Sequence, residues 1–180
     1  YFAIFRVDKD GTVIEVTREV SKPNGVALSP DEKTLYAADH DNGGESVDDP
    51  NAPPATPGPM KIYAFPLGPD GLVSGERKTL VDFGDQSGCD GMTVDEKGNI
   101  YLTARSAKRP GVMIINPEGE EVGFIPPRSP APGDAGNEAS LPSNVEFGIG
   151  DEANVLYVTA GTGLYRIRLT ARGHRPRRAR

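Results

Sequence analysis

The sequence predicts an all-β protein built as a β-propeller, and three observations point to this fold class. First, 22 glycines and 17 prolines divide the 180 residues into segments too short for a helical domain. Second, one strand–turn–strand pattern occurs three times along the chain. Third, alternating apolar runs joined by Asp-Gly or Glu-Gly turns, a strong hairpin signal, lie between these copies.

The repeated pattern is a short apolar strand, a polar turn and a second strand that ends in small residues. Its copies occupy residues 23–39, 89–104 and 142–160. Aligning the copies places Asn24, Asp90 and Ser143 at one equivalent position, close to the start of the first strand of each copy. We therefore expect these three side chains to lie at matching places in the fold.

The hairpins between the copies complete a unit of four antiparallel strands, which is the composition of a propeller blade. They span residues 2–17, 61–83 and 111–126, and residues 164–169 supply the first strand of a fourth. The predicted domain, residues 1–170, then holds the outer strands of one blade (1–20), two blades (23–83 and 89–126) and an incomplete last blade (142–170).

About three and a half blades do not close a ring, and an open arc would expose unpaired strand edges. We therefore expect the chain to be the C-terminal part of a longer propeller protein, and its start at Tyr1 rather than Met agrees with this interpretation. The alternative is that two copies of the chain close one ring together.

The distribution of charge argues against some classes of partner. The net charge is -6, and residues 1–171 hold 15 of the 20 basic residues against all 26 acidic ones. Because phosphate binding requires a basic surface, we expect no nucleic-acid partner. Apolar runs are too short for a membrane span, so no membrane partner is expected, and the sequence leaves the cellular compartment open. The Arg-rich end, residues 171–180, is predicted to be a solvated, disordered tail.

The single cysteine, Cys89, excludes an intrachain disulfide and a cysteine-based zinc site. We expect it to be a small buried residue.

The direction of the strands predicts which loops share one mouth of the propeller channel. The starts of the innermost strands open there together with the loops 39–60, 105–110 and 161–163. This arrangement brings His40 and Arg105 to the same mouth as Asn24, Asp90 and Ser143. We assign His40, Arg105 and Ser143 as candidate substrate contacts, while ordinary solvated or hydrogen-bonded side chains remain the alternative for each.

Asn24 and Asp90 form a candidate metal site. An amide carbonyl and a carboxylate are hard oxygen ligands, which suit calcium, magnesium or manganese, and a bound cation promotes hydrolysis. The alternative is structural, because Asn-Gly and Asp-Gly are also common turn dipeptides.

Three stretches of the sequence resemble one known family, that of senescence marker protein, gluconolactonase and luciferin-regenerating enzyme. They read KPNGVALSPDEKTLY at 22–36, DGMTVDEKGNIY at 90–101 and PSNVEFGIGDEANVLYVT at 142–159. The similarity covers nearly all of residues 1–170. The resemblance implies a six-bladed propeller.

The resemblance also implies a metal-dependent hydrolase that opens a small, sugar-derived lactone. By motif, Asn24 is a metal ligand, and Asp90 is a ligand and candidate general base. The expected cofactor is one divalent cation, with calcium first and zinc, manganese or magnesium as alternatives. The family's further ligand, a first-blade glutamate, is not found in this sequence, so we expect residues 1–180 by themselves to be inactive.

A non-catalytic propeller that binds a ligand or protein at the same mouth is the rival interpretation. The identity of the lactone and the oligomeric state are left open.

Overall fold

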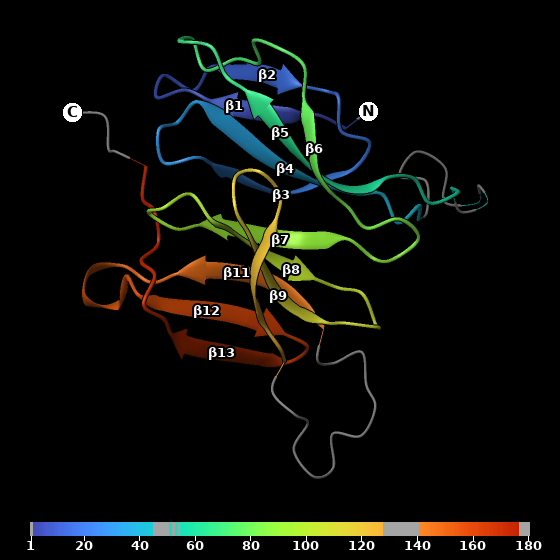
Figure 1. Cartoon of the computed structure of the whole chain (residues 1–180). Coiled ribbons are helices and arrows are strands. Elements are labelled where there is room, and N and C mark those ends of the chain that lie inside the picture. The colour runs from blue at the N-terminus through green and yellow to red at the C-terminus, as the bar shows by residue number, and fades with distance from the viewer. Residues whose placement is uncertain (1, 45–50, 52, 54, 128–140, 177–180) are drawn as a thin grey trace.

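The computed structural model describes residues 2–44, 51, 53, 55–127 and 141–176. Within this part of the chain the secondary structure consists of strands β1–β13 and the short 3₁₀ helix η2 (Gly150–Glu152), so the all-β prediction is confirmed (Figure 1). Among the described residues, no helix is long and apolar enough to cross a membrane.

The strands form four antiparallel sheets, each built from consecutive strands. Sheet 1 contains β1 (Ile4–Val7) and β2 (Val13–Thr17). Sheet 2 contains β3 (Pro23–Leu28), β4 (Thr34–His40), β5 (Met60–Pro66) and β6 (Lys78–Asp82). Sheet 3 contains β7 (Cys89–Val94), β8 (Ile100–Ala104), β9 (Gly111–Ile115) and β10 (Glu121–Ile125). Sheet 4 contains β11 (Pro142–Phe147), β12 (Val155–Ala160) and β13 (Gly163–Arg168).

Local turn chemistry explains why these hairpins form. In the β1–β2 and β5–β6 connections, Gly11 and Gly71 have φ of 87° and 73°, conformations that favour glycine. An aspartate precedes each glycine, and its carboxylate accepts a hydrogen bond from the backbone N–H two residues further on. The N–H of Thr12 donates to Asp10, and the N–H of Leu72 donates to Asp70. The Asp-Gly signal in the sequence thus marks real turns.

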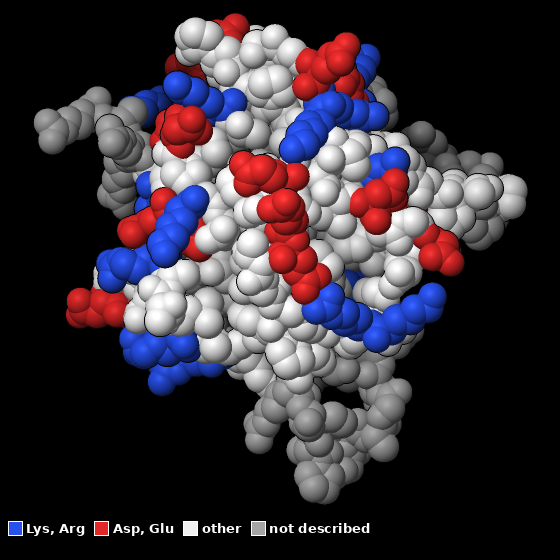
Figure 2. All heavy atoms as spheres, viewed as in Figure 1, with Lys and Arg blue, Asp and Glu red and all other residues white. Residues whose placement is uncertain are grey.

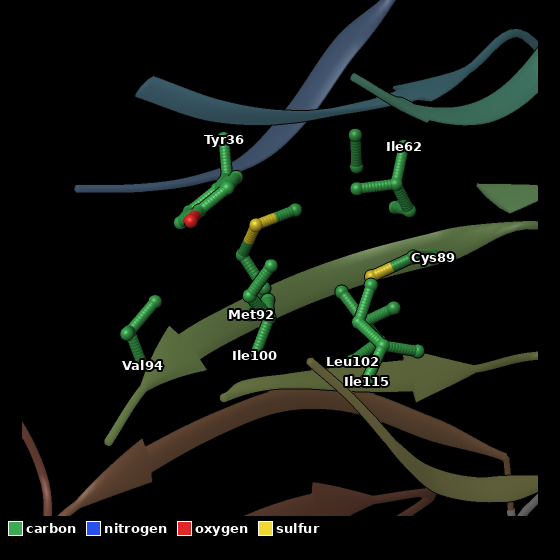
Figure 3. Packing of buried hydrophobic residues seen from close by; sticks show 9 residues of the cluster. Tyr36, Ile62, Cys89, Met92, Val94, Ile100, Leu102 and Ile115 are labelled. Carbon is green, nitrogen blue, oxygen red and sulfur yellow. The ribbon is translucent and has the colours of Figure 1, made fainter. Parts of the chain in front are cut away.

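Among the described residues, the apolar side chains form three cores, one between each pair of successive sheets. The core between sheets 2 and 3 contains Tyr36, Ile62, Met92, Leu102 and Ile115, with Cys89 fully buried among them, as expected from the sequence (Figure 3). A second core lies between sheets 1 and 2, and a third between sheets 3 and 4. The chain therefore packs as a succession of sheets, which is how propeller blades pack.

The first strands of sheets 2, 3 and 4 lie next to one another. β7 is in contact with β3 on one side and with β11 on the other, and Figure 1 shows the three strands following one another through the molecule. Glycines permit this approach: a Cβ on Gly25 would lie 2.4 Å from the Asp90 carbonyl oxygen, and one on Gly91 would lie 2.2 Å from Asn144 Oδ1. The glycines of the Asn-Gly and Asp-Gly motifs thus serve strand packing.

Residues 171–176 are hydrogen-bonded to the sheets, which differs from the solvated tail expected from composition. Their backbone joins two turns: Glu96 N–H donates to Arg172 O, Gly173 N–H to Ala153 O and His174 N–H to Val94 O, each at 2.8 Å. Backbone hydrogen bonds and burial of Gly173 therefore outweigh the polar composition of this segment. The rest of the tail, 177–180, lies outside the described residues.

Candidate functional site

The site is built on three irregular strand starts. The regular register of β3, β7 and β11 is interrupted after the first residue of each strand, between Pro23 and Val26, Cys89 and Met92, and Pro142 and Asn144. Such bulges bend a strand and redirect side chains, and they are common near active sites. The equivalent residues Asn24, Asp90 and Ser143 fall within these irregular stretches.

Asp90 is the centre of a cluster that joins two sheets. Asn24 Nδ2, from β3 of sheet 2, donates to Asp90 Oδ1 at 3.1 Å. His40 Nδ1, from the end of β4, lies 3.3 Å from the same oxygen. Arg105 Nη1, just after β8, lies 3.0 Å from Asp90 Oδ2. Four of the five candidate residues therefore meet at one carboxylate, whose side chain keeps 22% exposure to solvent.

The position of His40 fixes which of its ring nitrogens carries a proton. His40 Nδ1 also lies 3.1 Å from the backbone carbonyl of Cys89. Because a carbonyl oxygen only accepts hydrogen bonds, Nδ1 is the donor in this contact. Only 9% of the His40 side chain is exposed. Its Nδ1–H group is therefore directed toward the Asp90 carboxylate and the backbone carbonyl of Cys89.

Arg105 links Asp90 to the neighbouring sheet. The same Nη1 atom that pairs with Asp90 donates to the carbonyl oxygen of Pro142, the first residue of β11, at 3.0 Å. The guanidinium thus lies where sheets 3 and 4 meet, with 27% of the side chain exposed. Burial and these two acceptors hold the positive charge beside Asp90.

Sequence reasoning missed Thr103, which holds the backbone of the Asp90 bulge. Its hydroxyl oxygen accepts the N–H of Asp90 at 3.2 Å and donates to the carbonyl of Gly91 at 3.0 Å. Thr159 occupies the matching place on β12, 2.9 Å from Ser143 Oγ. The signal was present in the sequence, because two of the three repeat copies end in Thr-Ala.

Ser143 is exposed at the start of β11, and its described contacts are with Thr159 rather than with Asp90. Asn144, the next residue, accepts the backbone N–H of Val145 through its side chain at 2.9 Å. Ser143 is therefore not brought into the Asp90 cluster, although it holds the equivalent position of its strand.

The donor set of Asn24 and Asp90 fits a hard divalent cation. The two side chains approach within 3.1 Å, and turning the Asn24 amide would present its oxygen, beside the carboxylate, to a cation. Within the described residues there is no group of three or more His, Cys, Asp or Glu side chains placed to hold a metal. Asn24 and Asp90 could thus supply two oxygen ligands to such a cation.

Two cavities of the described structure are not lined by Asp90. The larger, about 390 Å³, is lined mainly by apolar residues of β9, β10, β12 and β13, with Pro142 at its edge. The smaller, about 130 Å³, lies at the opposite end of β3 and β7, beside His174. Geometry and charge, rather than cavity size, therefore single out the Asp90 cluster as the candidate site.

Charges of both signs are interspersed over the face of the molecule shown in Figure 2. Among the described residues, some charged side chains form local ion pairs, such as Lys61 with Asp82 and Arg109 with Glu121. On this face the described residues form no continuous basic surface.

A family model described as "SMP-30/Gluconolactonase/LRE-like region" matches residues 56–162, more than half of the chain. A gluconolactonase of Zymomonas mobilis is 30% identical over 174 residues, covering 93% of this chain and 40% of that protein. The lactonohydrolase oryL of Aspergillus oryzae is 32% identical over 124 residues, covering 62% of this chain and 26% of that protein. The chain thus spans less than half the length of these curated relatives.

Solved structures show the same likeness. A gluconolactonase from Xanthomonas campestris superposes with a TM-score of 0.66 at 26% identity, covering 93% of this chain and 44% of that one. Regucalcin from Agrobacterium tumefaciens, a calcium-binding protein, superposes with a TM-score of 0.64 at 20% identity, covering 96% of this chain and 53% of that one. At 20% identity, the similarity to regucalcin shows a shared fold.

Proposed function

The chain belongs to the SMP-30/gluconolactonase/LRE-like family, and from this premise we propose that the protein hydrolyses a small, sugar-derived lactone with the help of one divalent cation. The observation that carries the proposal is the meeting of Asn24 and Asp90 at 3.1 Å from two different sheets, with His40 and Arg105 against the same carboxylate. The gluconolactonase and lactonohydrolase relatives support the choice of a lactone as substrate.

In this proposal Asp90 is the general base. Its Oδ1 atom is engaged by Asn24 and His40, while Oδ2 has Arg105 Nη1 as its described partner and retains a lone pair for a water proton. Asp90 takes that proton as the water oxygen bonds to the lactone carbonyl carbon. The bond between that carbon and the ring oxygen then breaks, and Asp90 gives the proton it accepted to the ring oxygen, which becomes a hydroxyl group. The product is an open-chain hydroxy acid.

Asn24 and Asp90 would hold the divalent cation, calcium first among the candidates. When bound, such an ion polarises the substrate carbonyl and stabilises the negative charge that develops on its oxygen. His40 orients the Asp90 carboxylate, and Thr103 fixes the backbone on which that carboxylate stands.

We also propose that sheets 1–4 are successive blades of a six-bladed propeller. The support is their order along the chain, the cores between neighbouring sheets and the superposition on a gluconolactonase structure. A structure of the complete encoded protein with six blades around one axis would agree with this proposal, and any other blade number would contradict it.

The test of function uses the complete protein as encoded in its source, assayed with glucono-δ-lactone by pH-stat with and without added Ca²⁺. Asp90→Asn should lower the rate above the spontaneous reaction by roughly 10²- to 10⁴-fold, as expected for loss of a general base. The matched control is Asp82→Asn, an exposed carboxylate on β6 paired with Lys61, which should retain full activity.

Asn24→Ala should weaken Ca²⁺ binding, measured by calorimetry, because it removes one of the two oxygen ligands that residues 1–180 would supply. Full hydrolysis by the Asp90→Asn variant would exclude the proposed base. Cation binding at Asn24 and Asp90 without hydrolysis by the unmodified protein would instead identify a non-catalytic binding propeller.

A further inference from the structure

We propose that Arg105 is a carboxylate-binding group that holds the hydroxy-acid product at the site, an inference that rests on the proposed function. The starting observation is how the guanidinium is used. Both described contacts of Arg105, with Asp90 Oδ2 and with the Pro142 carbonyl, are made by the single nitrogen Nη1. A guanidinium carries five N–H groups, of which these contacts use two.

The unused edge of Arg105 is the part suited to an anion. Nε and Nη2 have no hydrogen-bond partner among the described residues, and their parallel N–H groups form a fork that matches the two oxygens of a carboxylate. The side chain keeps 27% exposure, so a ligand at the mouth can reach it. Its anchored Nη1 atom lowers the conformational entropy that the side chain loses on binding.

Another arginine of the same loop shows what a satisfied guanidinium looks like. Arg109 donates from Nη1 and Nη2 to both carboxylate oxygens of Glu121, at 2.8 and 2.7 Å. It also lies over the ring of Phe124, 3.9 Å from the centroid. The fork of Arg109 is already filled by a carboxylate, whereas the fork of Arg105 is open beside Asp90.

The proposed reaction creates the group that this fork recognises. Hydrolysis turns a neutral lactone into a carboxylate, and this new charge forms beside Asp90, which would repel it. Arg105 Nη1 lies 3.0 Å from Asp90 Oδ2, so its positive charge offsets that repulsion where the product forms. The site should therefore distinguish a sugar acid from the corresponding neutral polyol.

The test measures binding rather than turnover. Gluconate and glucitol differ by a carboxylate in place of a CH₂OH group, and their affinities for the complete encoded protein are compared by calorimetry in metal-free buffer. Without metal, a preference for gluconate reports on protein groups. We expect gluconate to bind about tenfold tighter or more, the size of a charge-assisted hydrogen-bond pair.

Arg105→Met should remove this preference, and Arg105→Lys should keep part of it as a point charge. Arg109→Met, the matched control on the same loop, should leave the preference unchanged. Thermal unfolding of each variant confirms that it is folded, and Arg105→Lys keeps the test decisive if Arg105→Met fails to fold.

Two results would overturn the inference: an unmodified protein that binds gluconate no better than glucitol, including no detectable binding of either, or a preference that survives Arg105→Met. Neither result decides whether the protein hydrolyses lactones, because hydrolysis is measured separately. Conversely, an Arg105-dependent preference in a protein without lactonase activity would support the carboxylate site and reject the proposed function.

Discussion

Gly91 of β7 lies directly against Asn144 of β11, so that the Asp90 motif and the start of sheet 4 are in backbone contact. A Cβ on Gly91 would come within 2.9 Å of Asn144 Cα and 2.2 Å of its Oδ1 atom. The glycine that follows Asp90 is therefore fixed by the spacing of two neighbouring sheets. The spacing of the sheets and the placement of the site depend on the same residue.

Gly91→Ala should destabilise the fold by about 1–3 kcal/mol, because the added methyl group overpacks a contact that includes backbone. Urea unfolding measures the change. Gly88→Ala is the matched control three residues earlier, since its Cβ would meet atoms of Met60 and Phe83 at 3.4–3.5 Å, an ordinary van der Waals distance. Equal stability of the two variants would contradict the close packing of β7 on β11.

Thr103→Val should lower kcat with little change in KM, because the isosteric side chain no longer holds the Asp90 backbone. The part-buried N–H of Asp90 and the carbonyl of Gly91 also lose a partner, at a cost of about 1–3 kcal/mol in stability. Thr93→Val, on β7, removes a hydrogen bond to Glu146 instead and should leave kcat unchanged. If both variants changed kcat equally, Thr103 would have no particular role in positioning Asp90.

Gly173→Ala should destabilise the protein by about 1–3 kcal/mol, because the new methyl group would overlap Phe147. Its Cβ would lie 2.2 Å from Phe147 Cβ. Arg172→Ala serves as the control, since that side chain is 56% exposed and 3.8 Å from Glu96, and its loss should change stability by less than about 0.5 kcal/mol. Identical unfolding curves would show that residues 171–176 are not docked in solution.

The Cys89 thiol should resist alkylation by iodoacetamide in the folded protein. Burial raises its pKa to about 12, so the reactive thiolate is scarce at pH 8. At pH 10 the reaction should still be far slower than that of a free thiol of ordinary pKa, because most of the buried thiol remains protonated. Protein unfolded in urea should react fully at pH 8. Rapid modification of folded protein at pH 8 would mean that Cys89 is accessible.

The same raised pKa predicts a loss of stability in alkaline solution. The unfolded thiol ionises near its ordinary value, while the folded thiol stays protonated, so the contribution is present at neutral pH and is lost as the pH rises toward 12. Cys89→Ala should show a smaller decrease in unfolding free energy between pH 8 and 10. An identical decrease would assign the alkaline loss to other groups.

The internal repeats allowed most residues of the candidate site to be predicted from the sequence. Alignment of three copies placed Asn24 and Asp90 at one position, and the order of strands placed His40 and Arg105 at the same end; the structure brings these four together. Their roles in catalysis, metal binding and substrate recognition remain predictions.

The remaining features depend on three-dimensional fit. The bond from Arg105 to Pro142 joins residues 37 positions apart, and no local pattern encodes it. Residues 171–176 are polar in composition, yet Gly173 fits against Phe147 by shape, which charge counting does not detect. The sheet-to-sheet contact of Gly91 likewise appears in sequence only as a common turn dipeptide.

At the irregular starts of β3, β7 and β11, the identity of the side chain is independent of the strand pairing that builds the sheet. Three matching backbone positions carry an amide, a carboxylate and a hydroxyl group, at Asn24, Asp90 and Ser143, while the strand beyond each bulge pairs regularly. A side chain at such a position can be exchanged without altering the pairing that holds the sheet. One scaffold of this kind could therefore acquire new ligands by single substitutions, with each sheet contributing one interchangeable group to a shared opening.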